Sequence, residues 1–241
     1  MTDGGSATTN DNITGGAGND VFSTTSGYLD AGHVIDGGDG TDSFSLTNIT
    51  AVADSALENK TSIEKMTSAA TGLAVTLDKN AQAMGITTVT FAGTAAGGIL
   101  DTVTIQDDVT NAITVNLDDL NTAGNDDDHN TVDASTYTGV LTINTNSASS
   151  INGAAATEAA FTGGTGTSDT LNFHGATLDG TELGNISAIE NWVVKDDTAT
   201  DLTTVDANVA DGKSLSIDAR AIVSSNKALT CLLYTSPSPR D

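Results

Sequence analysis

The sequence is poor in the residues that cross-link, stiffen or fill the interior of most globular proteins. Its 241 residues include one cysteine, two prolines and only 4% aromatic residues. A single cysteine excludes an intramolecular disulfide and thiolate metal clusters. Because aromatic side chains dominate the packing of large cores, their scarcity predicts thin layers of smaller aliphatic residues.

Basic residues are also scarce. The chain has 8 Lys and Arg against 32 Asp and Glu, which gives a formal net charge of -24. Most of the acids are Asp, which favours turns over helices, so we expect the charge to lie in loops. Such a chain repels nucleic acid and anionic membranes and attracts cations. High charge with few aromatics is also typical of disorder, so we expect a loose chain when no cation is bound.

Long apolar runs and catalytic motifs are absent as well. No stretch of 18 or more apolar residues occurs, so no membrane span is expected. The opening segment "MTDGGSATTNDNITGG" has no basic and no apolar region, unlike a secretory signal peptide. The three histidines lack zinc-site spacing, and there is no P-loop and no G-x-S-x-G motif. We therefore predict that the chain is not an enzyme.

The end of the chain differs from everything before it. The segment "CLLYTSPSPRD", residues 231–241, contains the only cysteine and both prolines. It resembles the translation of a sequencing-library adapter. We therefore expect residues 231–241 not to be natural and exclude them from the fold prediction.

Short strands are the main structure that the sequence predicts. Six segments alternate apolar and polar residues with period two, and each ends near Gly, Asp or Asn, which is typical of a strand with one buried face. These segments are residues 73–77, 86–91, 101–105, 112–117, 140–144 and 214–218. A short helix is expected to begin with Asp54 as its N-cap. Since connections of helix length are missing, stacked coils are favoured over a doubly wound sheet.

The sequence also repeats over a long period. "GGDGT" at residue 37 recurs as "GGTGT" at residue 163, and "ALENKTSIEKM" at residue 56 recurs as "ELGNISAIENW" at residue 182. Trp192 aligns with Met66, so both are predicted to be core positions. The predicted organisation is a roll at 1–45, a first long unit at 37–162 and a truncated second unit at 163–230.

A shorter repeat combines glycine, acid and strand residues. "GGAGNDVFS" at residue 15 is followed by "GGDGTDSFS" at residue 37. Glycine lets the backbone bend and brings carbonyl groups together without Cβ collisions. Calcium takes six to eight oxygen ligands, from carboxylates and carbonyls alike. Asp20 and Asp42 hold the same place in the two copies, and Phe22 and Phe44 are expected to point into the interior.

These nonapeptides match the G-G-x-G-x-D-x-U-x repeat of calcium-binding β-rolls. The chain therefore resembles the repeats-in-toxin (RTX) family, and its long units resemble bacterial surface-layer proteins and large adhesins. The resemblance implies an all-β fold, in which a calcium-binding parallel β-roll leads into parallel β-solenoid-like repeats. It also implies calcium as cofactor and type I secretion to the cell surface without an N-terminal signal peptide. The implied partners are calcium ions, like subunits in an array, or cell-surface glycans.

We expect one calcium ion between the two glycine-rich copies. Its predicted ligands are the carbonyls of Gly15, Ala17, Gly37 and Asp39 with the carboxylates of Asp20 and Asp42. Asp11, in a short N-terminal repeat step, and Asp169, in the third copy "GGTGTSDTL", are weaker candidates. Because the acid of the third copy is displaced, that copy is compatible with a structural turn and with a metal site alike.

Two functions follow from these expectations. The first is a non-enzymatic, calcium-dependent structural segment of a secreted bacterial surface-layer or adhesin-like protein that folds on extracellular calcium. The alternative is the export and folding module of a secreted RTX enzyme, a protease or lipase, whose catalytic domain lies elsewhere. The long repeat units favour the first. Ligand binding by Thr-rich strand faces is a third possibility, but the Thr rows are irregular in the sequence.

Overall fold

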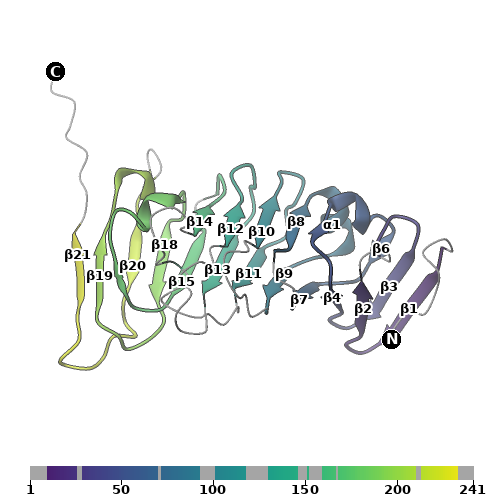
Figure 1. The fold of residues 1–241 in the computed structure, drawn as a ribbon, viewed down its shortest axis with the longest axis horizontal. Helices are drawn as coiled ribbons and strands as arrows, with labels where there is room; N and C mark the ends of the chain where they lie inside the picture. The colour runs from purple at the N-terminus through teal and green to yellow at the C-terminus, as the bar shows by residue number, and fades with distance from the viewer. Residues whose placement is uncertain are drawn as a thin grey trace, which may run out of the picture.

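The chain forms a parallel β-solenoid. The computed structural model describes residues 10–25, 29–69, 72–92, 101–117, 130–145, 151, 159–166, 168–209 and 213–232. Within these residues every strand pairing is parallel. Figure 1 shows the strands stacked along the long axis, from β1 at the N-terminal end to β21 at the other. The predicted all-β, parallel solenoid is confirmed.

One long sheet runs through the whole stack. In the described part of the chain it has nine strands, and each strand lies beside its equivalent in the next coil. Its members are β2 (Val21–Thr25), β4 (Ser43–Thr47), β7 (Lys65–Ser68), β9 (Thr88–Phe91), β11 (Ile113–Leu117), β13 (Leu141–Thr145), β15 (Thr170–Phe173), β18 (Asn191–Val194) and β20 (Ser216–Asp218). The sheet continues across the boundary that the sequence suggested at residue 163.

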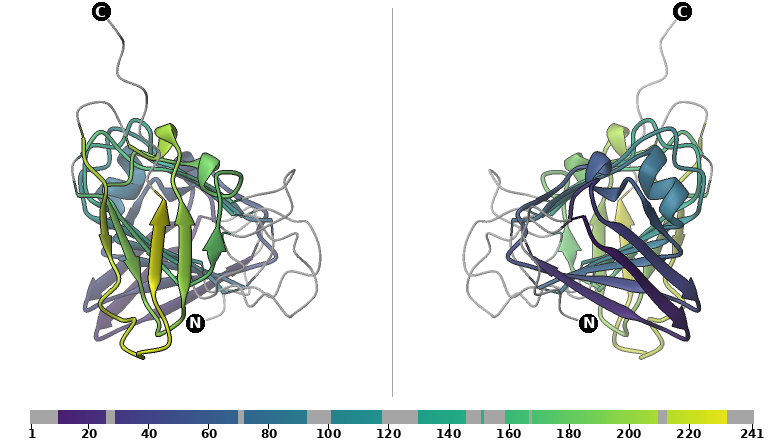
Figure 2. Two further views of the ribbon diagram at one scale, coloured as in Figure 1. Left: turned by 90° about the vertical axis from the view of Figure 1, so that its left-hand side faces the viewer. Right: turned by 90° about the vertical axis from the view of Figure 1, so that its right-hand side faces the viewer.

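Three shorter sheets form the other walls (Figure 2). The largest contains β5 (Ala51–Val52), β8 (Ala74–Leu77), β10 (Thr102–Ile105), β12 (Thr131–Asp133), β14 (Ala160–Thr162) and β17 (Ile186–Ser187). At the N-terminal end lie β1 (Asn12–Ala17), β3 (Val34–Asp39) and β6 (Lys60–Thr61), and at the other end β16 (Thr177–Leu178), β19 (Thr200–Thr203) and β21 (Leu229–Leu232). β21 includes Cys231 and Leu232, the first residues of the segment left out of the fold prediction.

Helical segments are short and lie between strands. They are η1 (Asp54–Leu57), α1 (Lys79–Met84), η3 (Leu183–Asn185) and η4 (Asp206–Asn208). The helix expected at Asp54 is a single 3-10 turn with Ala53, not Asp54, at its N-cap. The Asp54 carboxylate instead accepts N–H groups of Asp78 and Ala81, each at 2.9 Å, at the start of α1 in the next coil. The sequence did not predict α1, because the carboxylate that accepts its first N–H groups comes from another coil.

The interior is one continuous apolar column from Phe22 to Leu202. The predicted strands occur within two residues of their expected bounds. Phe22 and Phe44 point inward as predicted and pack edge to face, with ring centroids 6.1 Å apart. Met66 and Trp192 are also buried, which confirms both as core positions.

The outer face of the nine-stranded sheet is polar but almost uncharged. Its outward side chains are Ser, Thr and Asn with few exceptions, and Lys65 and Asp218 are its only charged residues in the described strands. The amide of Asn172 donates to Asn144, and that of Asn144 to Asn116, each at 2.7 Å. In-register pairing also stacks Thr88, Thr114, Thr142 and Thr170. These rows are more regular than the sequence indicated.

Neighbouring coils approach each other closely at particular glycines. A Cβ atom on Gly163 would lie 1.9 Å from the carbonyl oxygen of Ala188 in the next coil. No atom lies within 4 Å of the corresponding position on Gly184, in η3. Gly163 is therefore required by the coil spacing, whereas Gly184 is not.

We predict that Gly163→Ala lowers the free energy of unfolding by about 1–3 kcal/mol, because the added methyl group forces two coils apart. Gly184→Ala is the matched control and should change it by less than about 0.5 kcal/mol. Urea unfolding of both variants measures the difference. Equal midpoints for the two variants would contradict the observed coil spacing.

Candidate metal centre

The two glycine-rich nonapeptides lie directly on top of each other. In the pairing of β1 with β3, Gly16 lies opposite Gly38 and Ala17 opposite Asp39. The glycines thus continue the strands before the chain bends toward β2 and β4. Gly38 has φ +94°, and a Cβ on it would lie 2.1 Å from the carbonyl oxygen of Gly16. Only glycine fits both this conformation and this contact.

Asp20 carries an oxygen atom whose hydrogen-bonding capacity is unmet. Its Oδ2 is buried and has no hydrogen-bond partner among the described residues. This atom lies 2.6 Å from the place where a Cβ on Gly15 would be, and the carbonyl oxygen of Gly37 lies 2.4 Å from the same point. Two acceptors thus converge over a bare α-carbon, and no donor of the described chain reaches the carboxylate oxygen. Such an arrangement is costly unless a donor or cation satisfies both.

Asp42 has a similar unmet oxygen, but it faces the next coil. The side chain is fully buried, and its Oδ1 accepts the N–H of Asp20 at 2.6 Å. Its Oδ2 has no partner in the described chain and lies 2.5 Å from the Cβ position of Gly37. The carbonyl oxygen of Ser62 lies 1.9 Å from that position. Asp42 thus contacts the backbone of Asp20 through one oxygen, while its other oxygen lies beside the carbonyl of Ser62.

Two of the remaining candidates already accept hydrogen bonds from backbone N–H groups. The carbonyl of Asp39 accepts the N–H of Gly18 at 2.7 Å. Both carboxylate oxygens of Asp169 are occupied, since they accept N–H groups from Leu141 at 2.9 Å and Gly164 at 2.7 Å. Of the two interpretations of the third copy, this geometry favours the structural turn.

The bends that contain residues 15–20 and 37–42 form what we call the glycine-rich corner. Acidic residues are stacked on successive coils there. The N–H of Asp42 donates to Glu64 Oε2 at 2.8 Å, just as the N–H of Asp169 donates to Glu190 Oε2 at 3.1 Å. None of the ion pairs in the described chain involves Asp20, Asp42 or Glu64. The long repeat aligns Glu64 with Glu190 but does not reveal that both act as acceptors in the stack. The only signal for it was their equal place in the long repeat.

The composition of the corner limits the kind of metal site it can form. Within the described residues, no group of three or more His, Cys, Asp or Glu side chains could hold a metal ion. A cation here would therefore take most of its ligands from carbonyl groups and water. Calcium accepts such mixed oxygen ligands, whereas zinc prefers nitrogen and sulfur. The residues present fit calcium better than zinc.

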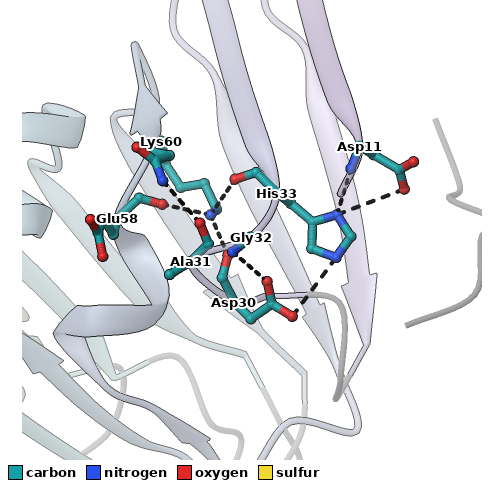
Figure 3. A network of polar contacts seen from close by, with 8 residues as sticks. Asp11, Asp30, Ala31, Gly32, His33, Glu58 and Lys60 are labelled. Carbon is teal, nitrogen blue, oxygen red and sulfur yellow. Dashed lines mark hydrogen bonds and ion pairs between the residues drawn. The ribbon is translucent and has the colours of Figure 1, made fainter. Parts of the chain in front are cut away.

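A second polar cluster lies at the start of β1 and β3 (Figure 3). Lys60 is 2% exposed, and its ammonium donates to the carbonyls of Asp30 at 2.6 Å, His33 at 2.7 Å and Glu58 at 2.8 Å. Burial lowers the pKa of Lys60 to about 8, although Asp30 and Glu58 act in the opposite direction. The ammonium group thus joins β6, which contains Lys60, to the turn before β3.

Asp11 belongs to this second cluster and not to the glycine-rich corner. Its N–H donates to His33 Nδ1 at 3.2 Å, and its Oδ2 lies 3.7 Å from the same nitrogen. The other ring nitrogen of His33 lies 3.9 Å from Asp30 Oδ2. Asp11 therefore contacts the buried imidazole just before the start of β1, whereas Asp20 follows the end of that strand.

The lowered pKa of Lys60 predicts a dependence of stability on pH. Between about pH 8 and its ordinary value of 10.5, the unfolded chain binds more protons than the folded chain. The free energy of unfolding contributed by this group therefore rises as the pH rises through that range. Urea unfolding at neutral and alkaline pH should show this gain in the unsubstituted protein and in Lys195→Met, whose lysine is exposed, but not in Lys60→Met. A parallel pH dependence of all three proteins would contradict it.

Comparison with protein-family models, curated proteins and solved structures finds no match for this chain. In the part of the chain that the structure describes, no helix has the length and apolar character needed to cross a bilayer.

Proposed function

We propose that the chain is a non-enzymatic, calcium-dependent structural segment of a secreted bacterial surface-layer or adhesin-like protein. The observation that carries this proposal is the unmet carboxylate oxygen of Asp20, which converges with the carbonyl of Gly37 over Gly15. Calcium would supply the positive charge that no lysine, arginine or histidine of the described chain provides there. The resemblance of both nonapeptides to RTX repeats supports the same ion.

The charge of the chain explains why calcium would control folding. At a net charge of -24, stacked acidic residues repel one another, and bound calcium would remove this repulsion only in the folded state. The dependence should be strongest in the first coils, where Asp20 and Asp42 lie. The later coils bury a continuous apolar core, and their Asp169 is satisfied by N–H donors. Calcium would therefore order one end of a solenoid whose remainder is held by packing.

The uncharged face of the nine-stranded sheet supports an extracellular assembly role. Two copies of so acidic a chain repel each other over most of their surface, but this face carries only Lys65 and Asp218 in its described strands. Its Thr and Asn side chains suit contact with a like face or with the hydroxyl groups of a neutral glycan. Assembly into an array and attachment to cell-surface glycans are the two uses we propose for it.

The alternative is an export and folding module of a secreted RTX enzyme. Calcium-dependent folding would be the same in both cases, so the full reading frame must distinguish them. A protease or lipase motif in the same chain would favour the module. Further long units like those at 37–162 and 163–230 would favour the surface protein.

The calcium dependence is tested by thermal unfolding of the purified chain in chelator, in magnesium and in roughly millimolar calcium, the range of extracellular modules. We expect calcium alone to stabilise the protein, by about 2.7 kcal/mol once its concentration is about 100 times the Kd. Asp20→Asn should lose the part of this gain that the ion beside Asp20 contributes, because the amide replaces the unmet oxygen.

Asp201→Asn is the matched control, because it removes the same charge from an exposed position on β19. It should respond to calcium like the unsubstituted protein. Identical unfolding of the unsubstituted protein in calcium and in chelator would refute the proposed function.

A further inference from the structure

We infer a second calcium site, formed by the carboxylate of Asp42 and the carbonyl of Ser62. It lies between the second coil, which contains β3 and β4, and the third coil, which contains β6 and β7. It rests on the proposed calcium dependence, but it joins the second glycine-rich copy to the next coil and not to the first copy. Its second half is the bend "TSIE", residues 61–64, which contains no glycine and belongs to the long repeat. This bend would then supply the carbonyl ligand of the cation site.

The unmet oxygen of Asp42 is the first observation. The side chain is 0% exposed, and its Oδ2 is buried without a hydrogen-bond partner in the described chain. The oxygen points to the same side of Gly37 as the Ser62 carbonyl, and both lie within 2.5 Å of the Cβ position there. Two acceptors that face each other in a buried place repel unless a cation or a donor lies with them.

The residue that carries this carbonyl has an uncommon backbone conformation. Ser62 has φ +55°, a conformation that is uncommon for residues other than glycine. Glu64 then accepts the N–H of Asp42 at 2.8 Å, which brings a second negative charge to the same corner. Calcium would be held by Asp42 Oδ2 and the Ser62 carbonyl, with Glu64 adding charge.

The second long unit provides an internal comparison. Ala188 takes the place of Ser62 with φ +54°, and its carbonyl lies 1.9 Å from the Cβ position of Gly163. Here, however, the N–H of Gly164 donates to Asp169 Oδ2 at 2.7 Å. The same bend therefore has a donor in the second unit and lacks one in the first. This difference assigns a cation to Asp42 and none to Asp169.

Two aspartate variants distinguish a cation ligand from a structural acceptor. Asp42→Asn keeps an acceptor for Asp20 and gains an N–H that can donate to Ser62. It should bind one calcium fewer in calorimetric titration, yet be at least as stable as the unsubstituted protein in chelator. Asp169→Asn should bind as many ions as the unsubstituted protein, yet be less stable in chelator, because Gly164 loses its acceptor.

Glu64→Gln is a third variant, which keeps the acceptor for Asp42 and removes one charge. It should raise the Kd of one calcium ion several-fold and leave the other unchanged. If Asp42→Asn fails to fold, an unchanged titration of Glu64→Gln still overturns the inference.

The two proposals fail differently. If the unsubstituted protein binds no calcium, both are wrong. If it binds one ion that Asp20→Asn removes and Asp42→Asn and Glu64→Gln do not affect, only the second site is wrong. A loss of stability of Asp42→Asn in chelator would also overturn it, because that is the result expected of a structural acceptor.

Discussion

The in-register stacking of parallel coils is the constraint on which the rest of the structure depends. Each residue lies beside its equivalent in the next coil, so like side chains meet like. Apolar residues then form one continuous core, and asparagine amides form a hydrogen-bonded row. Acidic residues, however, also meet acidic residues. Stacking is favourable for the first two kinds, but for the third it requires a donor or a cation.

The chain resolves this conflict differently at its two ends. Near β15, backbone N–H groups from two neighbouring segments satisfy Asp169. Near β1 and β3, Asp20 and Asp42 each keep a buried oxygen without a partner in the described chain. Lys60 shows that the fold can bury its own cation, since its ammonium bonds three carbonyl groups in the third coil. We propose that calcium satisfies the buried acceptors of the glycine-rich corner, as the Lys60 ammonium satisfies the carbonyl groups around it.

Local patterns predicted much of the fold, because solenoid strands bury one face and so alternate with period two. The strands near residues 86–91 and 112–117 follow from that alternation, and the buried position of Trp192 follows from its alignment with Met66 in the long repeat. Contacts between coils could not be predicted, since they depend on the number of residues in each turn. Asp54 was expected to cap its own helix but accepts N–H groups at the start of α1, one coil later. Asp42 likewise has an oxygen beside the carbonyl of Ser62 in the next coil. The partner of an acid is thus decided by register and not by its neighbours in sequence.

We propose that a cation satisfies the buried acceptors of the glycine-rich corner in the first coils, and that the later coils do not need one. Hydrogen exchange of backbone amides, followed by mass spectrometry in calcium and in chelator, tests it most directly. Peptides covering residues 10–25 and 29–47 should lose protection when calcium is removed, while those covering residues 130–145 and 168–194 should keep theirs. Equal protection of the first coils in both conditions would contradict it.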